Sequence, residues 1–392
     1  MRRPIATFVV LLALAGCAPG VGRSARSPAP TPTIAAVTQF PAPATTPLDP
    51  GKAVSLQAVL DKVVSQYAAL PDSESASRGV TAAVLTDRWS WSGAAGRDAA
   101  GSRLTPDTSF GVASITKTFV AAEVLLLAQR GALDLDAPLS AYVKHPLTAN
   151  NATVRQHLAM RSGVPNYRNE DYAKVDRAIA AAPGRHWTAE EALSYATAAP
   201  NAPDSAYSYS NPSYVLLGML IEKVSGQPLA VALRRDLATV AGLERAAFQD
   251  HEKPRPPLAE DRNVVCGRAV DGFTPCRAFA SLSAANAGMA ADAPSVARWG
   301  YQLYGSRVIP GELVRQMTDG AGEYGLGTML YSNAFGIHSA VGHRGASPDV
   351  SSILVVVPDQ RLALAVLLAD GNKVPDTVAA SLITAIEPLL AR

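Results

Sequence analysis

The sequence has few cysteines and no block of like charges. Of its 392 residues, three are cysteine, and 35 basic residues nearly balance 33 acidic ones, for a net charge of +2. Charges spread in this way form no electrostatic patch for nucleic acid, so we expect no nucleic-acid partner. With 48% hydrophobic and only 17% charged residues, the chain also differs from a disordered protein and can bury a large core.

Motifs of several common enzyme classes are missing as well. No Gly-x-Ser-x-Gly occurs, which excludes the nucleophile elbow of an α/β-hydrolase. No glycine-rich loop for a dinucleotide or a nucleoside phosphate is present, and we expect no cofactor. Beyond the N-terminus, no uninterrupted apolar run approaches the length of a membrane helix.

The first 17 residues have the order of a bacterial export signal. Arg2 and Arg3 precede an apolar stretch over residues 5–14, and Leu-Ala-Gly leads directly into Cys17. We therefore predict a lipoprotein signal peptide and lipobox over residues 1–17, with acyl chains on Cys17 anchoring the protein to the membrane. The alternative is a plain secretory signal with an accidental cysteine. The expected location is the outer face of the cytoplasmic membrane or the cell envelope.

The next segment, residues 18–52, is rich in Pro, Ala and Thr, which favours an extended tether in front of a folded body over residues 53–392. Two cysteines, Cys266 and Cys276, remain for this body. In an oxidising compartment they are expected to form a disulfide. A zinc site is the weaker alternative because no histidine lies beside either thiol, and we predict no metal.

Hydrophobic periodicity predicts strands near both ends of the body and helices between them. We expect an α+β fold in which an antiparallel sheet, built from both ends of the chain, is flanked by N- and C-terminal helices. A mainly helical subdomain is inserted over roughly residues 135–285. The expected strands are 80–85, a segment around 89–91, 339–342, 351–357 and 362–368; the clearest expected helices are 119–129, 214–224 and 374–390.

A serine and a lysine lie one helical turn apart in Ser114-Ile115-Thr116-Lys117, so both project from one face. The helix that follows is apolar nearly all round, which places Lys117 in a low dielectric and favours the neutral amine that accepts a proton from serine. Backbone N–H groups at the helix start can bind an oxyanion. By itself this short match also fits an exposed serine and lysine.

Tyr209-Ser210-Asn211 supplies a phenol and an amide in a polar loop before an apolar helix. The same spacing occurs at Tyr167 and Tyr331, which we interpret as structural because of their charged-loop and strand contexts. A third segment, Gly342-His343-Arg344-Gly345-Ala346, lies on a late strand whose glycines let a substrate backbone approach. On its own, His343 is equally well explained as a structural histidine.

Together these three motifs resemble the serine penicillin-recognising enzymes, most closely class C β-lactamases, D-alanyl-D-alanine carboxypeptidases and related esterases. The resemblance covers roughly residue 53 to the C-terminus. It extends to further segments, which are Leu133–Leu139, Met160–Pro165, Tyr209–Gly226 and Tyr324–Gly327.

The resemblance implies a β-lactamase/transpeptidase-like fold and an acyl-enzyme mechanism. The implied roles are Ser114 as nucleophile, Lys117 as base, Tyr209 as proton relay, Asn211 as substrate-positioning amide, His343 as the third-motif residue, Gly345 as a substrate contact, and the backbone N–H groups of Ser114 and Ala346 as oxyanion hole. The implied substrates are peptidoglycan D-Ala-D-Ala peptides, β-lactams or small esters, which the sequence does not separate.

Arg344 departs from the pattern, since a small hydroxyl residue is often found there. It is a candidate ligand for a substrate carboxylate. Strict strand alternation instead points it away from the face of His343 and Gly345, where it would form a structural ion pair. A catalytically inactive envelope binding or scaffold protein that keeps the fold is the alternative function.

Overall fold

A computed structural model describes residues 39–68, 79–203, 206–260, 265–266, 272–320, 322–347, 350–370 and 374–390. The helices are α1 Pro50–Ala68, α2 Thr116–Gln129, α3 Val154–Leu158, α4 Asn169–Ala181, α5 Ala189–Leu193, α6 Asn211–Ser225, α7 Leu229–Leu233, α8 Arg277–Leu282, α9 Ala293–Tyr304, α10 Gly311–Thr318 and α11 Asp376–Leu390. The strands are β1 Val80–Leu85, β2 Ser90–Ala95, β3 Phe110–Gly111, β4 Ala247–Phe248, β5 Met289–Ala291, β6 Met329–Ser332, β7 Ser339–Ala346, β8 Ser351–Val357 and β9 Leu362–Leu368.

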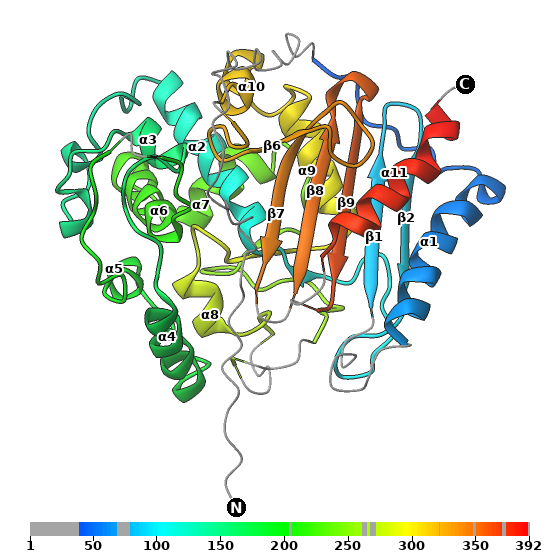
Figure 1. The fold of residues 1–392 in the computed structure, drawn as a ribbon, viewed down its shortest axis with the longest axis horizontal. Helices are drawn as coiled ribbons and strands as arrows, with labels where there is room; N and C mark the ends of the chain where they lie inside the picture. Colours follow the sequence, from blue (N-terminus) through cyan, green and yellow to red (C-terminus); the bar gives the residue numbers. More distant parts are fainter. Residues whose placement is uncertain are drawn as a thin grey trace, which may run out of the picture.

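The main sheet joins the two ends of the chain, as predicted. Its six antiparallel strands run in the order β2-β1-β9-β8-β7-β6, so the first hairpin pairs with the last strand (Figure 1). Every residue of β8 and β9 is buried, which fits their continuous apolar sequences. A second, three-stranded sheet has the order β3-β5-β4. Its strand β3 ends at Gly111, shortly before Ser114 and α2.

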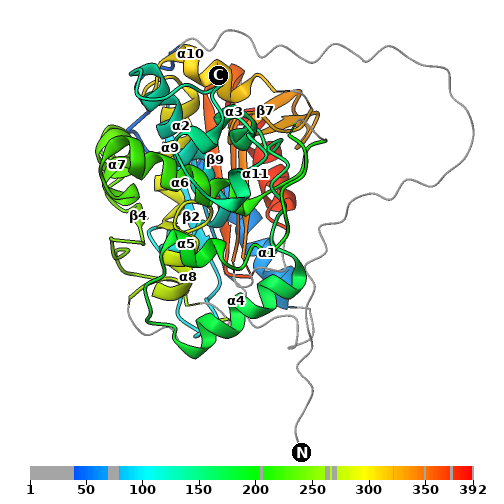
Figure 2. The same cartoon turned by 90° about the vertical axis from the view of Figure 1, so that its left-hand side faces the viewer.

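Helices cover both faces of the main sheet. On one face α1 and α11 pack together and against the sheet, while α9 packs on the other face (Figure 1). The helical part, which contains α3 to α8, lies beside α2 and faces the viewer in Figure 2. This α+β arrangement confirms the predicted fold class.

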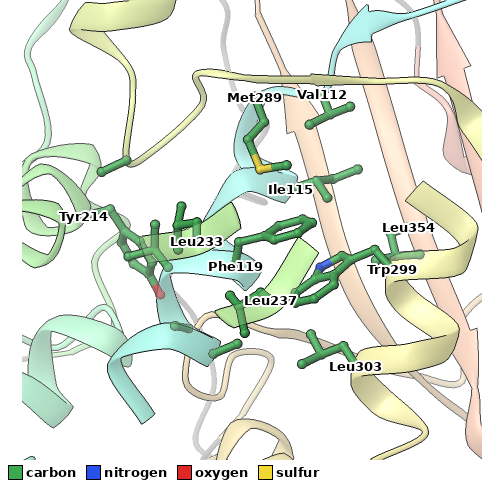
Figure 3. Packing of buried hydrophobic residues seen from close by; sticks show 14 of the residues in the cluster. Val112, Ile115, Phe119, Tyr214, Leu233, Leu237, Met289, Trp299, Leu303 and Leu354 are labelled. Atoms are coloured by element: carbon green, nitrogen blue, oxygen red, sulfur yellow. The ribbon is translucent and has the colours of Figure 1, made fainter. Parts of the chain in front are cut away.

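A large apolar core holds the helix that carries the site. α2 is buried from Thr116 to Leu127, so it runs through the interior. The ring of Phe119 stacks on Trp299 of α9 at a centroid distance of 3.6 Å, and Figure 3 shows Ile115 and Leu237 beside them. Trp299 also donates a hydrogen bond from Nε1 to the Thr118 hydroxyl at 2.8 Å. The first turns of α2 are therefore fixed by packing on several sides.

The folded body begins earlier than the composition suggests. Phe40 is buried against the ring of Tyr301, and its N–H donates to the carbonyl of Gly305 at 2.9 Å. Residues 39–49 therefore belong to the body and not to the tether expected over residues 18–52. The predicted lipobox with Cys17 lies outside the described residues. Cys266 and Cys276 form the disulfide that the sequence predicts.

No single helix among the described residues is long and apolar enough to cross a membrane. Helix α6 and the following segment Leu229–Ala238 are together long and apolar enough, but the two are bent by 77° relative to each other.

Candidate active site

Ser114 lies in a short 3-10 turn, Ala113–Ile115, directly before α2. Ala113 has a positive φ of 47°, a conformation that is uncommon for any residue other than glycine. Two hydrogen bonds hold this turn. The Ser352 hydroxyl donates to the Val112 carbonyl at 2.9 Å, and the Thr116 hydroxyl donates to the Ala113 carbonyl at 2.7 Å. Ser114 therefore stands on a fixed backbone that is tied to both the sheet and the helix.

Gly345 is the point where β7 meets this turn. A Cβ atom there would lie 2.4 Å from the Val112 carbonyl oxygen and 3.1 Å from the Ala113 Cβ. The glycine is required by the protein's own backbone, whereas the sequence suggests a role in admitting the substrate backbone. Ala346 is the next residue and the exposed end of β7. The end of β7 thus lies beside the Ser114 turn. The prediction that the backbone N–H groups of Ser114 and Ala346 form an oxyanion hole requires this proximity.

Lys117 is fully buried one turn after Ser114, and its Nζ has three polar neighbours. These are Ser114 Oγ at 2.9 Å, Asn211 Oδ1 at 2.8 Å and the Asn286 carbonyl oxygen at 2.8 Å. The two amide oxygens can only accept hydrogen bonds, so they take the two N–H groups of a neutral amine. The remaining lone pair then faces the Ser114 hydroxyl, as a general base requires.

The surroundings of Lys117 favour this neutral state. None of the ion pairs found among the described residues involves Lys117. Its Nζ lies instead 4.9 Å from the centroid of the Tyr209 ring and 5.6 Å from that of Tyr214. Burial lowers the pKa of the Lys117 ammonium well below its ordinary value. A buried lysine without a carboxylate partner is suited to accept a proton.

Tyr209 completes the cluster from the loop before α6. Its hydroxyl lies 2.9 Å from Ser114 Oγ, so the structure brings this motif to the serine. Burial raises the pKa of Tyr209 far above its ordinary value, although the hydrogen bond with Ser114 opposes the shift. Tyr209 is therefore a neutral phenol that can donate a proton.

The other two tyrosines of the same spacing lie elsewhere. The Tyr167 hydroxyl donates to the Ala192 carbonyl at 3.2 Å inside the helical part. Tyr331 belongs to the core between the sheet and α11, and its ring lies 5.2 Å from the Arg344 guanidinium. Both are structural, as the sequence context indicates.

Asn211 links the lysine to the wall of the site. Besides accepting from Lys117, its amide Nδ2 donates to the Tyr172 hydroxyl of α4 at 3.0 Å, and its backbone N–H donates to Asn166 Oδ1 at 3.0 Å. Both ends of the side-chain amide are thus engaged within the protein. Asn211 thus contacts Lys117 directly, and the substrate-positioning role that the resemblance implies stays a prediction.

His343 and Arg344 point to opposite sides of β7. His343 is fully buried on the side of Tyr209, and the two ring centroids are 6.5 Å apart. Arg344 lies on the other side, where its Nε donates to Asp376 of α11 at 2.7 Å. Strand alternation therefore decides the question left open by the sequence. Arg344 forms a structural ion pair and is not placed to bind a substrate carboxylate.

Sequence reasoning missed three residues of the site. The carbonyl of Asn286 has no side-chain signature, because any residue supplies it. Tyr172 lies in a charged helix and comes close to Asn211 only through the fold. Tyr324 contacts His343 through its hydroxyl at 3.1 Å. Its only signal was the Tyr324–Gly327 segment shared with the family.

This α+β fold and its serine-lysine-tyrosine cluster define a protein of the β-lactamase/transpeptidase-like superfamily. A family model described as Beta-lactamase matches residues 60–386, and the chain belongs to this family.

Sequence relatives include "Esterase EstB" of Burkholderia gladioli, which is 32% identical over 251 residues, 57% of this chain and 63% of the esterase. "Protein flp" of Staphylococcus aureus (strain MRSA252) is 26% identical over 187 residues, 44% of this chain and 33% of that protein. The chain thus spans less than two thirds of the length of either relative. Among solved structures, the D-amino acid amidase of Ochrobactrum anthropi SV3 complexed with L-phenylalanine amide has a similar fold, with a TM-score of 0.71 at 23% identity over 86% of this chain and 99% of the amidase.

Proposed function

We propose that the protein is a serine hydrolase that cleaves esters or amides through an acyl-enzyme on Ser114. One observation carries this proposal. Ser114 Oγ lies 2.9 Å from both Lys117 Nζ and the Tyr209 hydroxyl, and the other two partners of Lys117 can only accept. A serine held between a neutral amine and a neutral phenol has both a base and a proton donor in place.

Acylation then proceeds in two steps. Ser114 Oγ attacks the carbonyl carbon while its proton passes to Lys117 Nζ, and the negative charge moves to the carbonyl oxygen, which the N–H groups of Ser114 and Ala346 bind. Collapse of this intermediate breaks the bond to the leaving group. The leaving oxygen or nitrogen takes a proton from the Tyr209 hydroxyl, and the proton on the Lys117 ammonium then passes to the Tyr209 oxygen. The product is an ester on Ser114, and Lys117 is neutral again.

Deacylation repeats the same chemistry with water. A water molecule attacks the acyl carbonyl and gives its proton to the Lys117 and Tyr209 pair. Ser114 Oγ leaves and is protonated, which releases the carboxylic acid and restores the starting state. Both ring nitrogens of His343 are engaged, with the Tyr324 hydroxyl and the Arg344 carbonyl, so we give it no part in either proton transfer.

Esters and simple amides are the substrate class that we propose. The relatives "Esterase EstB" and D-amino acid amidase carry these activities in their names. Arg344 is held by Asp376 on the far side of β7, so the strand offers no guanidinium to a substrate carboxylate. This arrangement favours neutral esters and amides over β-lactams and D-Ala-D-Ala peptides, which carry a carboxylate beside the reacting bond.

A fluorophosphonate probe tests the nucleophile directly. The wild-type protein should be labelled on Ser114, and Ser114→Ala should abolish labelling without changing the melting temperature by more than a few degrees. No labelling of a folded wild-type protein would instead support a non-catalytic envelope protein that keeps the fold. Steady-state rates on a nitrophenyl ester, an amino acid amide, a chromogenic β-lactam and a D-Ala-D-Ala peptide then rank the substrates.

We further propose that the enzyme is attached to the outer face of the cytoplasmic membrane through a lipid on Cys17. The order of basic, apolar and small residues before Cys17 supports this location. The wild-type protein should partition into detergent, and Cys17→Ala should leave an uncleaved precursor or a released product. A soluble wild-type protein that has lost Cys17 would contradict the lipid anchor.

A further inference from the structure

Tyr324, in the segment before β6, makes a hydrogen bond behind the catalytic cluster. Its hydroxyl lies 3.1 Å from His343 Nε2, and the other ring nitrogen, Nδ1, lies 2.5 Å from the Arg344 carbonyl oxygen. A carbonyl can only accept, so Nδ1 carries the imidazole proton. Nε2 is then the acceptor, and the Tyr324 hydroxyl is its donor. The lone pair of His343 is therefore occupied from inside the protein.

This pair supports the ring of Tyr209. The ring centroids of Tyr209 and Tyr324 are 6.4 Å apart at an interplanar angle of 87°, and those of Tyr209 and His343 are 6.5 Å apart. Tyr324 and His343 also pack edge to face at 5.7 Å. Because both residues are buried, with exposures of 4% and 0%, they form a fixed wall behind the phenol that contacts Ser114.

The segment that carries Tyr324 is fastened to α2 close to Lys117. A Cβ atom at Gly327 would lie 2.3 Å from the Ala121 Cβ and 3.1 Å from the Lys117 carbonyl oxygen, so only glycine permits this approach. The N–H of Gly327 also donates to the Leu158 carbonyl at 3.1 Å. Tyr324 is thus held at a fixed position relative to the catalytic lysine.

We propose that Tyr324 is a positioning residue of the reaction, which acts through His343: by donating to Nε2 it keeps the imidazole a neutral support for Tyr209 and prevents it from acting as an acid or base. This inference rests on the proposed serine hydrolase function. It assigns a task to the Tyr324–Gly327 segment and gives His343 a different role from the catalytic one that its motif suggests.

The charges around His343 give the proposal a pH signature. The groups that face it are Tyr324, Tyr209 and Lys117, with the Arg344 guanidinium on the neighbouring residue. Burial lowers the pKa of His343 to about 3. Without the Tyr324 hydroxyl the neutral imidazole loses its donor, and its pKa rises. An imidazolium beside Lys117 would then oppose proton transfer from Ser114.

Tyr324→Phe tests this, with Tyr304→Phe as the matched control. Tyr304 is an equally buried tyrosine whose hydroxyl contacts the Thr328 hydroxyl at 3.0 Å, away from His343. On a nitrophenyl ester we expect Tyr324→Phe to lower kcat about tenfold and to change KM less than threefold. Its pH profile should gain an acid limb that the wild-type profile lacks, because the pKa of His343 rises when the Tyr324 donor is lost. Tyr304→Phe should show neither effect.

The same substitution in a His343→Gln background separates positioning from general damage. If Tyr324 acts through His343, adding Tyr324→Phe to His343→Gln should change kcat less than twofold further. A full tenfold loss in that background, or an effect in Tyr304→Phe equal to that in Tyr324→Phe, would overturn the proposal. Absence of Ser114 labelling in the wild-type protein would refute the proposed function, and this inference with it.

Discussion

Asn211→Asp is the sharpest test of Lys117 as the general base. The substitution is nearly isosteric and replaces a neutral oxygen 2.8 Å from Lys117 Nζ by a carboxylate oxygen. The Tyr172 hydroxyl, which now accepts from Asn211, can rotate and donate to the new group. The change therefore adds one negative charge beside the lysine and keeps the shape of the site.

The expected size follows from this distance. At an effective dielectric constant of about 20, unit charges 2.8 Å apart attract each other by about 6 kcal/mol, or roughly four pKa units. Desolvation of the new carboxylate offsets part of this, which leaves an upward shift of roughly two to three units in the pKa of Lys117. A raised pKa means that Lys117 is protonated at neutral pH and cannot accept the Ser114 proton. Acylation is then lost near pH 7 and recovers as the pH rises through the new pKa.

The assay is the rate of fluorophosphonate labelling, or kcat/KM on an ester, measured from pH 6 to 10. Asn211→Ala is the control, because it removes the same hydrogen bond without adding charge and should not move the rising limb upward. If the pH profiles of Asn211→Asp and Asn211→Ala coincide, Lys117 is not the group whose deprotonation permits acylation.

Three further outcomes are expected. Tyr209→Phe should lower kcat/KM on esters and amides by at least about 100-fold, since it removes the proton relay. Tyr331→Phe should leave kcat/KM within about threefold of the wild-type value, and a larger loss in Tyr331→Phe than in Tyr209→Phe would refute the choice of Tyr209 as the relay. Arg344→Thr should change kcat/KM equally on charged and neutral substrates. It should lower the free energy of unfolding in urea by less than about 1 kcal/mol, because the ion pair with Asp376 is partly exposed. A loss of kcat/KM confined to carboxylate substrates would show that Arg344 binds the substrate. His157 is buried, and neither ring nitrogen has a hydrogen-bond partner among the described residues. Burial lowers its pKa to about 3, so only the unfolded state gains this proton as the pH falls below about 6.5, and stability declines by about 1.4 kcal/mol per pH unit until about pH 3. His157→Leu should reduce the loss of unfolding free energy between pH 7 and 5 by about 2 kcal/mol, and an unchanged pH dependence would contradict the buried neutral state.

Local sequence predicts those strands and helices whose residues are all buried alike. Leu362–Leu368 is an apolar run between turn residues, and β9 has these same bounds because every residue of it is buried. The strand predicted at 339–342 and the third motif, predicted on a late strand, belong to one strand, since β7 runs from Ser339 to Ala346. Its final residues alternate between a buried histidine, an exposed arginine and a glycine. Their shared strand character comes from pairing with β8, which periodicity does not reveal.

The core of the site was also accessible to sequence reasoning, because Ser114 and Lys117 share one helical turn. Tyr209 could be chosen among three matches by its loop context alone. The remaining contacts depend on long-range folding. Asn286 contributes only a carbonyl, and Phe40 is a single apolar residue in a proline-rich stretch whose partner, Tyr301, lies far along the chain. Neither leaves a local pattern.

The pairing of β1 with β9 also has a consequence for biogenesis. The central sheet cannot close until residue 368 has been synthesised, and Ser114 meets Gly345 only when β7 is in place. Contacts of such large sequence separation make folding slow. A product truncated before β9 would leave Val80–Leu85 and the wholly apolar Ile353–Val357 segment without their partner strand. Such fragments should aggregate and be degraded, so that only complete chains bring Ser114 and Gly345 together.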